Sequence, residues 1–322
     1  MDEKLIDCVV CGSCVADILC GPVPLDVPLG EGQLHHVNPI QLIGGGITSN
    51  SGITLAKLGR SVKVFTYIGN DSFGQMLTDM FERSGVDTSS LLVHPEAPTS
   101  TTAVLVSESG ERTFLHANGA PKKMDMRHYY KHIETLEQAR VFLWGYYGLN
   151  PNIESDLPKL LEELRARKTR TVIDSAGDGG SLSPLDKMLP HLDLYVPSLI
   201  EAQNQTGLKD PDKIIEKYRS LGAPGILGVK LGEKGALLSS LPNQYLEVAA
   251  IKPPGEVIDT TGAGDSFLAG LISGLLENLS LEECGKLAVA AGACAVTTVG
   301  GWCGSKDRAA VGELAGIKTK SK

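Results

Sequence analysis

Hydrophobic residues in this chain gather in short runs that are separated by stretches with helical spacing. Residues 5–11 form a mostly apolar run, which is typical of a strand buried on both faces of a sheet. Residues 154–168 instead carry leucines at the spacing of one helix face, and strand-like runs at 141–144 and 171–174 flank them. Strands and helices in alternation predict βαβ units. We therefore expect an α/β fold with a mainly parallel sheet that is covered by helices on both faces.

A second set of short strands predicts a smaller sheet. Residues 101–106 and 112–116 are rich in strand-forming residues and flank a turn that contains glycine, which indicates a hairpin. Residues 33–43 resemble an irregular strand, and Pro39 places it at an edge because proline has no N–H to donate to a ladder. We therefore expect strands at about 33–43 and 100–117 to form a small sheet that projects from the main body.

Composition limits the classes of partner. The 322 residues are 42% hydrophobic and 21% charged, which are values typical of a globular protein. No repeat, low-complexity tract or long linker interrupts the chain, so we expect one domain over residues 1–322. The net charge of −8 argues against a nucleic acid or an anionic membrane as a partner. No apolar run approaches about 18 residues and the first residues are too acidic for a signal peptide, so we expect a cytoplasmic protein.

The cysteines do not indicate a disulfide framework, because their number, 7, is odd. Cys8, Cys11 and Cys14 have the spacing of an iron–sulfur run. However, residues three apart in a strand point to opposite faces, so Cys8 and Cys11 could not share a metal if residues 5–11 form a strand. We expect reduced thiols in the core instead.

The strongest chemical signal is the segment 259–267, Asp-Thr-Thr-Gly-Ala-Gly-Asp-Ser-Phe, which precedes a long apolar run. A helix that begins there would leave the N–H groups of Gly262, Ala263 and Gly264 without intrahelical partners, and such a helix end binds anions. A bound phosphate would repel Asp265, so this carboxylate needs another purpose. Taking a proton from a hydroxyl group that attacks the phosphate is such a purpose. The alternative is that Asp265 is only a favourable first-turn charge.

Two further polar side chains lie close to small-residue turns. Asp17 follows the first predicted strand, where open α/β sheets bind ligands, and it either contacts a ligand or turns the loop. Glycines at 44–46 let the backbone approach a ligand closely. Asn50, in the first turn of the helix predicted to follow them, offers two donors and an acceptor. These glycines match neither the dinucleotide fingerprint nor the P-loop pattern.

These motifs resemble the signatures of the ribokinase-like (phosphofructokinase B, PfkB) carbohydrate kinase family. The segment 259–267 resembles the C-terminal signature of the family, and Gly45, Gly46 and Asn50 resemble its N-terminal signature. Residues 12–17 have the spacing of the motif that carries the family's sugar-binding aspartate. The motifs occur in the family's order, so the resemblance covers nearly the whole chain.

Two motifs on the nucleotide side depart from the family pattern. Residues 197–201 resemble the family's N-x-x-E motif, with Glu201 retained but Ser198 where asparagine is usual. Residues 228–235 resemble the nucleotide-side turn, with Lys230 where threonine is common. These departures keep a non-catalytic, ligand-binding member of the fold as an alternative hypothesis.

The resemblance implies a three-layer α/β/α fold with a β lid. It also implies an ATP-dependent enzyme that transfers a phosphoryl group to a hydroxyl of a sugar or sugar-like substrate. The implied catalytic residues are a general base and an anion hole: Asp265, Gly262, Ala263 and Gly264. The implied substrate contacts are Asp17, Gly45, Gly46 and Asn50. The implied nucleotide contacts are Ser198, Lys230, Gly232 and Gly235.

The resemblance further implies cofactors and a partner. Glu201 would organise Mg²⁺ through water, and some family members bind a potassium-type ion (K⁺) at the positions of Asp259 and Thr261. The small sheet closes over the sugar in family members and is a dimer interface in some of them, so we expect a lid and a homodimer through it. Arg112, in the predicted hairpin, could reach a phosphate group on the substrate or lie in solvent.

The motifs do not define the acceptor. Val15 stands where ribokinases carry an asparagine. Ribokinases also carry a glutamate after the strand that corresponds to residues 143–147, and this chain has none there. Both differences disfavour ribose, whereas hexoses and keto sugars remain compatible. Tyr146 and Tyr147 could stack on a base, which keeps a nucleoside kinase as an alternative.

Overall fold

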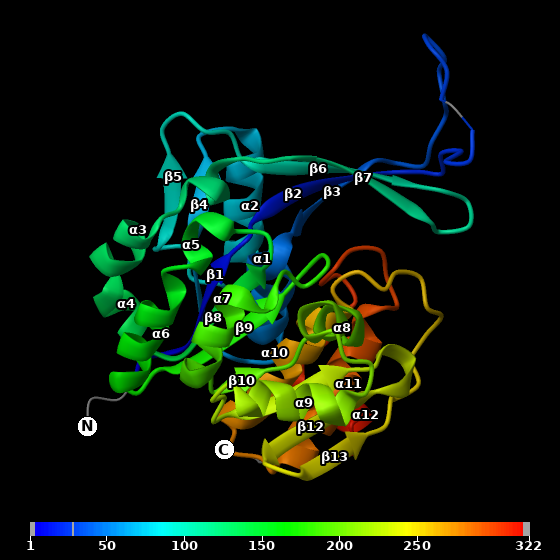
Figure 1. Cartoon of the computed structure of the whole chain (residues 1–322). Coiled ribbons are helices and arrows are strands. Elements are labelled where there is room, and N and C mark those ends of the chain that lie inside the picture. Colours follow the sequence, from blue (N-terminus) through cyan, green and yellow to red (C-terminus); the bar gives the residue numbers. More distant parts are fainter. Residues whose placement is uncertain (1–3, 28, 318–322) are drawn as a thin grey trace.

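The computed structural model describes residues 4–27 and 29–317. Within these residues, the main sheet has nine strands in the order β13-β12-β11-β10-β9-β8-β1-β4-β5 (Figure 1). Neighbours from β5 across to β11 are parallel, whereas β12 and β13 are antiparallel, which confirms a mainly parallel sheet. The strands are β1 (Ile6–Gly12), β4 (Val62–Gly69), β5 (Leu91–His94), β8 (Ala139–Tyr147), β9 (Arg170–Ser175), β10 (Leu194–Tyr195), β11 (Ile226–Lys230), β12 (Ala236–Leu241) and β13 (Gln244–Val248).

Helices pack on both faces of this sheet and complete three layers (Figure 1). The helices of one face are α1 (Gly46–Lys57), α2 (Ser72–Arg83), α10 (Ala263–Leu276), α11 (Leu281–Ala295) and α12 (Arg308–Leu314). Those of the other face are α3 (Met126–Lys131), α4 (Ile133–Glu137), α5 (Pro151–Glu154), α6 (Leu157–Ala166), α7 (Leu182–Met188), α8 (Leu199–Thr206) and α9 (Pro211–Ser220). Short 3₁₀ helices are η1 (Ala120–Lys123), η2 (Leu189–His191) and η3 (Gly232–Lys234).

Alternate side chains of β1 enter two separate hydrophobic cores. Cys8 and Val10 belong to the cluster on one face of the sheet, and Val9 and Cys11 belong to the cluster on the other. The strand is therefore buried on both faces, and Cys8 and Cys11 point apart, as the spacing predicted. Burial raises the pKa of both thiols, so they stay protonated within the core.

A four-stranded sheet in the order β3-β2-β6-β7 projects from the main body (Figure 1), and we call it the lid. Its strands are β2 (Val15–Cys20), β3 (Gln41–Gly45), β6 (Ser100–Val106) and β7 (Arg112–Ala117). The predicted hairpin is confirmed, because β6 and β7 pair antiparallel from Thr101 with Ala117 to Val106 with Arg112.

The lid prediction was wrong in two places. Residues 33–40 are not in a strand, and β3 begins only at Gln41, beyond Pro39, which has no N–H to donate to a ladder. The strand β2 was missed, because the small residues after β1 were interpreted as a turn that ends at Asp17. Asp17 instead lies within β2, between β3 and β6.

Helix positions agree with the predictions to within a few residues. The glycine-rich segment opens α1 at Gly46, and Lys57 ends it. The segment predicted as one helix at 154–168 is two, because α5 ends at Glu154 and α6 begins at Leu157, beside Pro158 in its first turn. Among the described residues, no helix is both long and apolar enough to cross a bilayer.

Candidate active site

The glycine-rich segment forms a loop that leads into α10. Gly262 precedes the helix in the left-handed conformation, with φ of +72°. A Cβ atom on Gly262 would lie 2.1 Å from the carbonyl oxygen of Gly301, so only glycine lets these two loops pack so closely. The N–H of Ala263 donates to the carbonyl oxygen of Thr260 at 3.3 Å. One of the three amides predicted to bind an anion therefore already has a partner within the turn.

Asp265 lies in the first turn of α10 and is only 8% exposed. Its Oδ2 accepts a hydrogen bond from Asn50 Nδ2 at 3.1 Å, and the hydroxyl of Tyr146 donates to Oδ1 and Oδ2 at 3.0 Å each. Burial raises the pKa of Asp265, which the Lys230 ammonium and these two hydrogen bonds oppose, while Glu201 adds to the increase. A carboxylate with a raised pKa is suited to accept a proton from a hydroxyl group that lies within hydrogen-bonding distance.

Tyr146 is a contact that the sequence interpretation missed, because it considered this ring only as a stacking surface. Burial and the Asp265 carboxylate raise the pKa of Tyr146, so the phenol keeps its proton and acts as the donor. Tyr147 cannot serve as an exposed stacking surface, since it is 1% exposed and its hydroxyl donates to the Ser181 carbonyl oxygen.

We expect Tyr146→Phe to move the acid limb of the kcat/KM profile to higher pH. The hydrogen bond from Tyr146 lowers the pKa of Asp265, so its loss raises this pKa and the base is protonated over a wider acid range. The charged groups that also face Asp265, namely Lys230, Glu201 and Asp174, are unchanged in this variant. The measurement is kcat/KM against pH, with Tyr147→Phe as the matched control. An acid limb that stays in place would contradict the assignment.

The predicted acceptor residues Asp17 and Asn50 each pack closely against a glycine, and Asn50 also donates to Asp265. A Cβ on Gly45 would lie 2.0 Å from Asp17 Oδ2, and one on Gly301 would lie 2.4 Å from Asn50 Oδ1, so both glycines leave room for these side chains. Among the described residues, Asn50 Oδ1 is a buried side-chain oxygen without a hydrogen-bond partner. Burial raises the pKa of Asp17 to about 6.

Gly46, also predicted to contact the substrate, packs against the backbone at the end of β1. Its φ is +78°, and a Cβ there would lie 2.5 Å from the carbonyl oxygen of Ser13. The same carbonyl accepts the N–H of Thr48 at 3.2 Å. The position of Gly46 is therefore explained by the packing of α1 against the end of β1.

A cavity of about 760 Å³ lies on the other side of the α10 N-terminus. This volume is within the range of small-ligand sites. The small-residue helix α11 forms one wall of the cavity, through Val289, Gly292 and Ala293. The predicted nucleotide residues Lys230, Gly232 and Gly235 line the cavity, together with Gly264, Val289 and Gly292.

Lys230 connects this cavity to the predicted base. Its Nζ donates to Asp174 Oδ1 at 3.0 Å, and a Cβ on Gly264 would lie 3.2 Å from the same Nζ. Burial lowers the pKa of Lys230, but the carboxylates of Asp174 and Glu201 more than offset this, so the side chain stays charged. Asp174 was missed by the sequence interpretation, although its place at the end of a predicted strand was a usable signal.

Ser198 and Glu201 contact each other at the start of α8. The Ser198 N–H donates to Glu201 Oε2 at 2.6 Å, and the Glu201 N–H donates to Ser198 Oγ at 3.3 Å, which is a capping box. Ser198 is therefore engaged as a helix cap. The charge of Glu201 acts on the pKa values of Asp174, Lys230 and Asp265, so this carboxylate faces the same cluster.

Asp259 and Thr261 contact the lid through Arg112. Arg112 Nη1 donates to Asp259 Oδ1 and to Thr261 Oγ1. Asp259 also accepts the N–H groups of Thr261 and Gly300, at 2.7 Å each. Burial works to raise the pKa of Asp259, but these hydrogen bonds outweigh it and hold the pKa below its usual range. Arg112 is not a solvated lid residue, since its side chain is 13% exposed.

Comparison with known proteins gives a consistent result. Residues 6–305 match the family model described as pfkB family carbohydrate kinase. The chain is 26% identical to the ribokinase of Haemophilus influenzae, over 81% of this chain and 83% of that one. It is also 26% identical to the 2-dehydro-3-deoxygluconokinase of Bacillus subtilis, over 84% and 85%. The structure of Arabidopsis thaliana ribokinase complexed with ribose and ATP is similar with a TM-score of 0.82, at 24% identity, over 97% of this chain and 99% of that one.

Proposed function

The chain belongs to the pfkB family of carbohydrate kinases, and we propose that Asp265 is the base with which it phosphorylates a hydroxyl of a sugar or sugar-like acceptor. Family membership makes the protein an ATP-dependent phosphotransferase with a ribokinase-like fold. The observation that carries the residue assignment is the position of Asp265 between the acceptor side, where Asn50 donates to it, and the nucleotide cavity beside Gly264. In this proposal, residues 1–322 form one kinase domain with an inserted lid.

In this proposal, Asp17 and Asn50 orient the acceptor so that one hydroxyl faces Asp265. Asp265 takes the hydroxyl proton, the acceptor oxygen forms a bond to the γ-phosphorus, and the bond to the bridging oxygen of ADP breaks. Lys230 and the amide of Gly264 stabilise the negative charge on the transferring group. Closure of the lid excludes water, which would otherwise compete as the acceptor.

Glu201 is the residue proposed to organise Mg²⁺, through water. Magnesium in phosphoryl-transfer sites takes one or two carboxylates together with phosphate oxygens and water, and it neutralises charge on the nucleotide. The Glu201 carboxylate fits this pattern, because it faces the charged cluster and only its Oε2 is used in the capping box. The predicted monovalent-cation ligands, Asp259 and Thr261, do not fit a free ion, since both face the Arg112 guanidinium.

The proposed function is tested by ADP release with Mg-ATP over a panel of acceptors. The panel contains pentoses, hexoses, keto sugars, sugar acids, inositol and nucleosides. We expect one sugar or sugar acid to drive ADP release far above the rate with ATP alone. Release with a nucleoside but no sugar would select a nucleoside kinase. ATP binding without any release over the panel would favour a non-catalytic member of the fold.

We also propose a homodimer through the outer face of the lid. Leu42, Ile18, Ala103 and Leu115 pair in one row across the four strands, on the face opposite to Asp17. Leu42 is 44% exposed and Leu115 is 59% exposed, so the row is an apolar surface that a second copy would cover.

We expect the wild type to be a dimer and Leu115→Lys to be a monomer, because a charge within an apolar interface must be desolvated. The measurement is molar mass by light scattering. Leu241→Lys is the matched control, since Leu241 is 53% exposed on β12 of the main sheet. A monomeric wild type at micromolar concentration would contradict the interface.

A further inference from the structure

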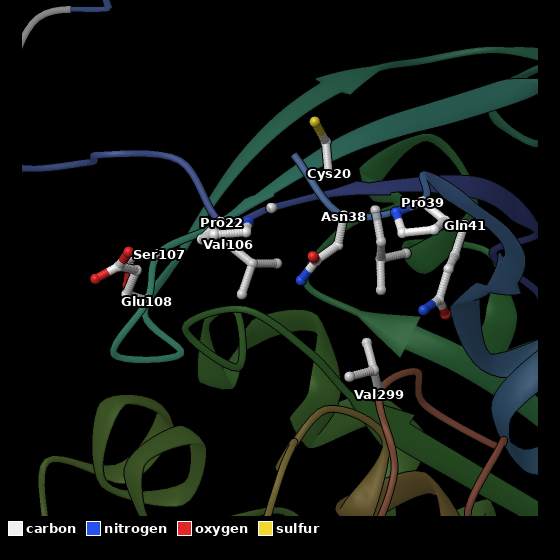
Figure 2. A pocket seen from close by; sticks show the side chains of 11 residues that line it. Cys20, Pro22, Asn38, Pro39, Gln41, Val106, Ser107, Glu108 and Val299 are labelled. Atoms are coloured by element: carbon white, nitrogen blue, oxygen red, sulfur yellow. The ribbon is translucent and has the colours of Figure 1, made fainter. Parts of the chain in front are cut away.

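The lid places one arginine against the loop that leads into the candidate anion hole. Arg112 is the first residue of β7 and pairs with Val106 of β6. Val106 also lines a cavity of about 370 Å³. Figure 2 shows Val106 and Gln41 of the lid on one side of this cavity and Val299 of the main body on the other. Arg112 Nη1 donates hydrogen bonds to Asp259 Oδ1 and Thr261 Oγ1 of the main body. The contact therefore joins the lid to the catalytic half of the molecule.

The partner of Arg112 is a carboxylate that needs a positive charge. The Asp259 side chain is 1% exposed and accepts hydrogen bonds from the backbone of Thr261 and Gly300, which ties the two loops that meet at Gly262 and Gly301. Its negative charge lies in the loop that ends at the phosphate-binding helix start. Without compensation, this charge would repel an incoming phosphoryl group.

The side-chain oxygen atoms of Asp259 and Thr261 are already occupied by hydrogen bonds from the protein itself. Asp259 Oδ1 and Thr261 Oγ1 both accept from Arg112 Nη1, and Asp259 Oδ2 accepts from the Gly300 N–H. The Arg112 guanidinium of the lid therefore contacts the two residues at whose positions some family members bind a potassium-type ion.

We propose that Arg112 is a tethered cation that replaces a free monovalent ion at Asp259 and makes the anion hole competent only when the lid is closed. This inference rests on the proposed kinase function. Arg112 is a positioning residue, since it acts on the loop before α10 and not on the reacting atoms. Lid opening removes the positive charge from Asp259, so ATP bound without an acceptor is hydrolysed slowly.

The test compares the wild type with Arg112→Gln in KCl and in choline chloride at equal ionic strength. The first readout is the initial rate of transfer to the acceptor. We expect equal wild-type rates in the two salts. For Arg112→Gln we expect a rate at least about tenfold lower in choline, as for loss of a group that stabilises the anion hole, with part of it regained in KCl. Arg112→Lys keeps the charge and should remain independent of K⁺.

The second readout is the melting temperature of the free protein, which does not depend on activity. We expect KCl to raise it relative to choline chloride for Arg112→Gln but not for the wild type. The matched control is Arg83→Gln, because the Arg83 side chain is 83% exposed. If no acceptor is phosphorylated, the proposed function fails while the melting experiment still tests the tethered cation.

Three results would overturn the inference. The first is a wild type whose rate or melting temperature depends on K⁺. The second is Arg112→Gln behaving as the wild type does in both salts. The third is Arg112→Gln losing activity without any response to K⁺, because Arg112 would then be a lid contact and not a substitute for an ion.

Discussion

Asp265→Asn is expected to lower kcat by about 10²–10⁴-fold, the usual contribution of a general base. The amide has nearly the same shape and can still accept a hydrogen bond from Tyr146, but it cannot take a proton from the acceptor. The KM for ATP should change little, because the nucleotide cavity is lined by other residues. The measurement is the steady-state rate at saturating ATP and acceptor.

Two controls separate lost chemistry from a lost fold. The melting temperature of Asp265→Asn should stay close to that of the wild type, and ATP should still protect the variant against unfolding. Asp259→Asn, in the loop that leads into α10, replaces a carboxylate by the same amide. It should lose less kcat at neutral pH, since Asp259 touches no reacting atom in this account. Full activity of Asp265→Asn would show that this carboxylate is not the base.

Lys230→Met is expected to lower kcat/KM for ATP by about 10²–10³-fold, as for loss of one group that stabilises the transferring charge. The same change removes the partner of Asp174, which is 3% exposed. Breaking a buried ion pair from one side costs about 3–5 kcal/mol of unfolding free energy. The measurements are kcat/KM for ATP and denaturant unfolding.

The pH dependence of this loss has a defined sign. Burial already raises the pKa of Asp174 above its unfolded value, and Lys230 opposes that increase. Without Lys230 the folded-state pKa rises further, so the folded variant binds a proton more tightly than the unfolded chain does. Its stability is retained at low pH and falls as the pH rises. The loss relative to the wild type should therefore be larger at pH 8 than at pH 5.

The double variant Lys230→Met with Asp174→Asn separates structure from chemistry. It leaves no uncompensated carboxylate at this position, so we expect stability to recover toward that of the wild type. Activity should remain low, because the ammonium beside Gly264 is still absent. If activity recovers together with stability, Lys230 only holds the fold and has no place in phosphoryl transfer.

Local sequence patterns were sufficient to predict those elements whose structure depends on residues close by in the chain. Gly262 and Gly264 before an apolar run predicted the start of α10, since a helix terminus is determined by the residues around it. The alternation at 101–106 and 112–116 predicted the β6–β7 hairpin for the same reason. The strand β2 escaped prediction because its pairing depends on β3 and β6, which lie far away in the sequence.

Contacts between distant segments could not be predicted from local patterns. Asn50 and Asp265 are 215 residues apart, and Tyr146 and Asp265 are 119 residues apart. The chain lacks the glutamate that ribokinases carry after the strand at residues 143–147. Nothing in this run indicated that the hydroxyl of Tyr146 would contact the base. Arg112 was expected to contact a substrate phosphate or to lie in solvent, and the structure instead places it on Asp259.

The central claim is that the γ-phosphoryl group moves to an acceptor hydroxyl activated by Asp265. It is tested most directly by ³¹P NMR of ATP, Mg²⁺ and the acceptor selected by the panel, with the wild type and Asp265→Asn in parallel. The account predicts a phosphate-ester resonance that grows with equimolar ADP in the wild type and is absent over the same time in the variant. Inorganic phosphate in place of the ester, or equal ester formation by both proteins, would contradict it.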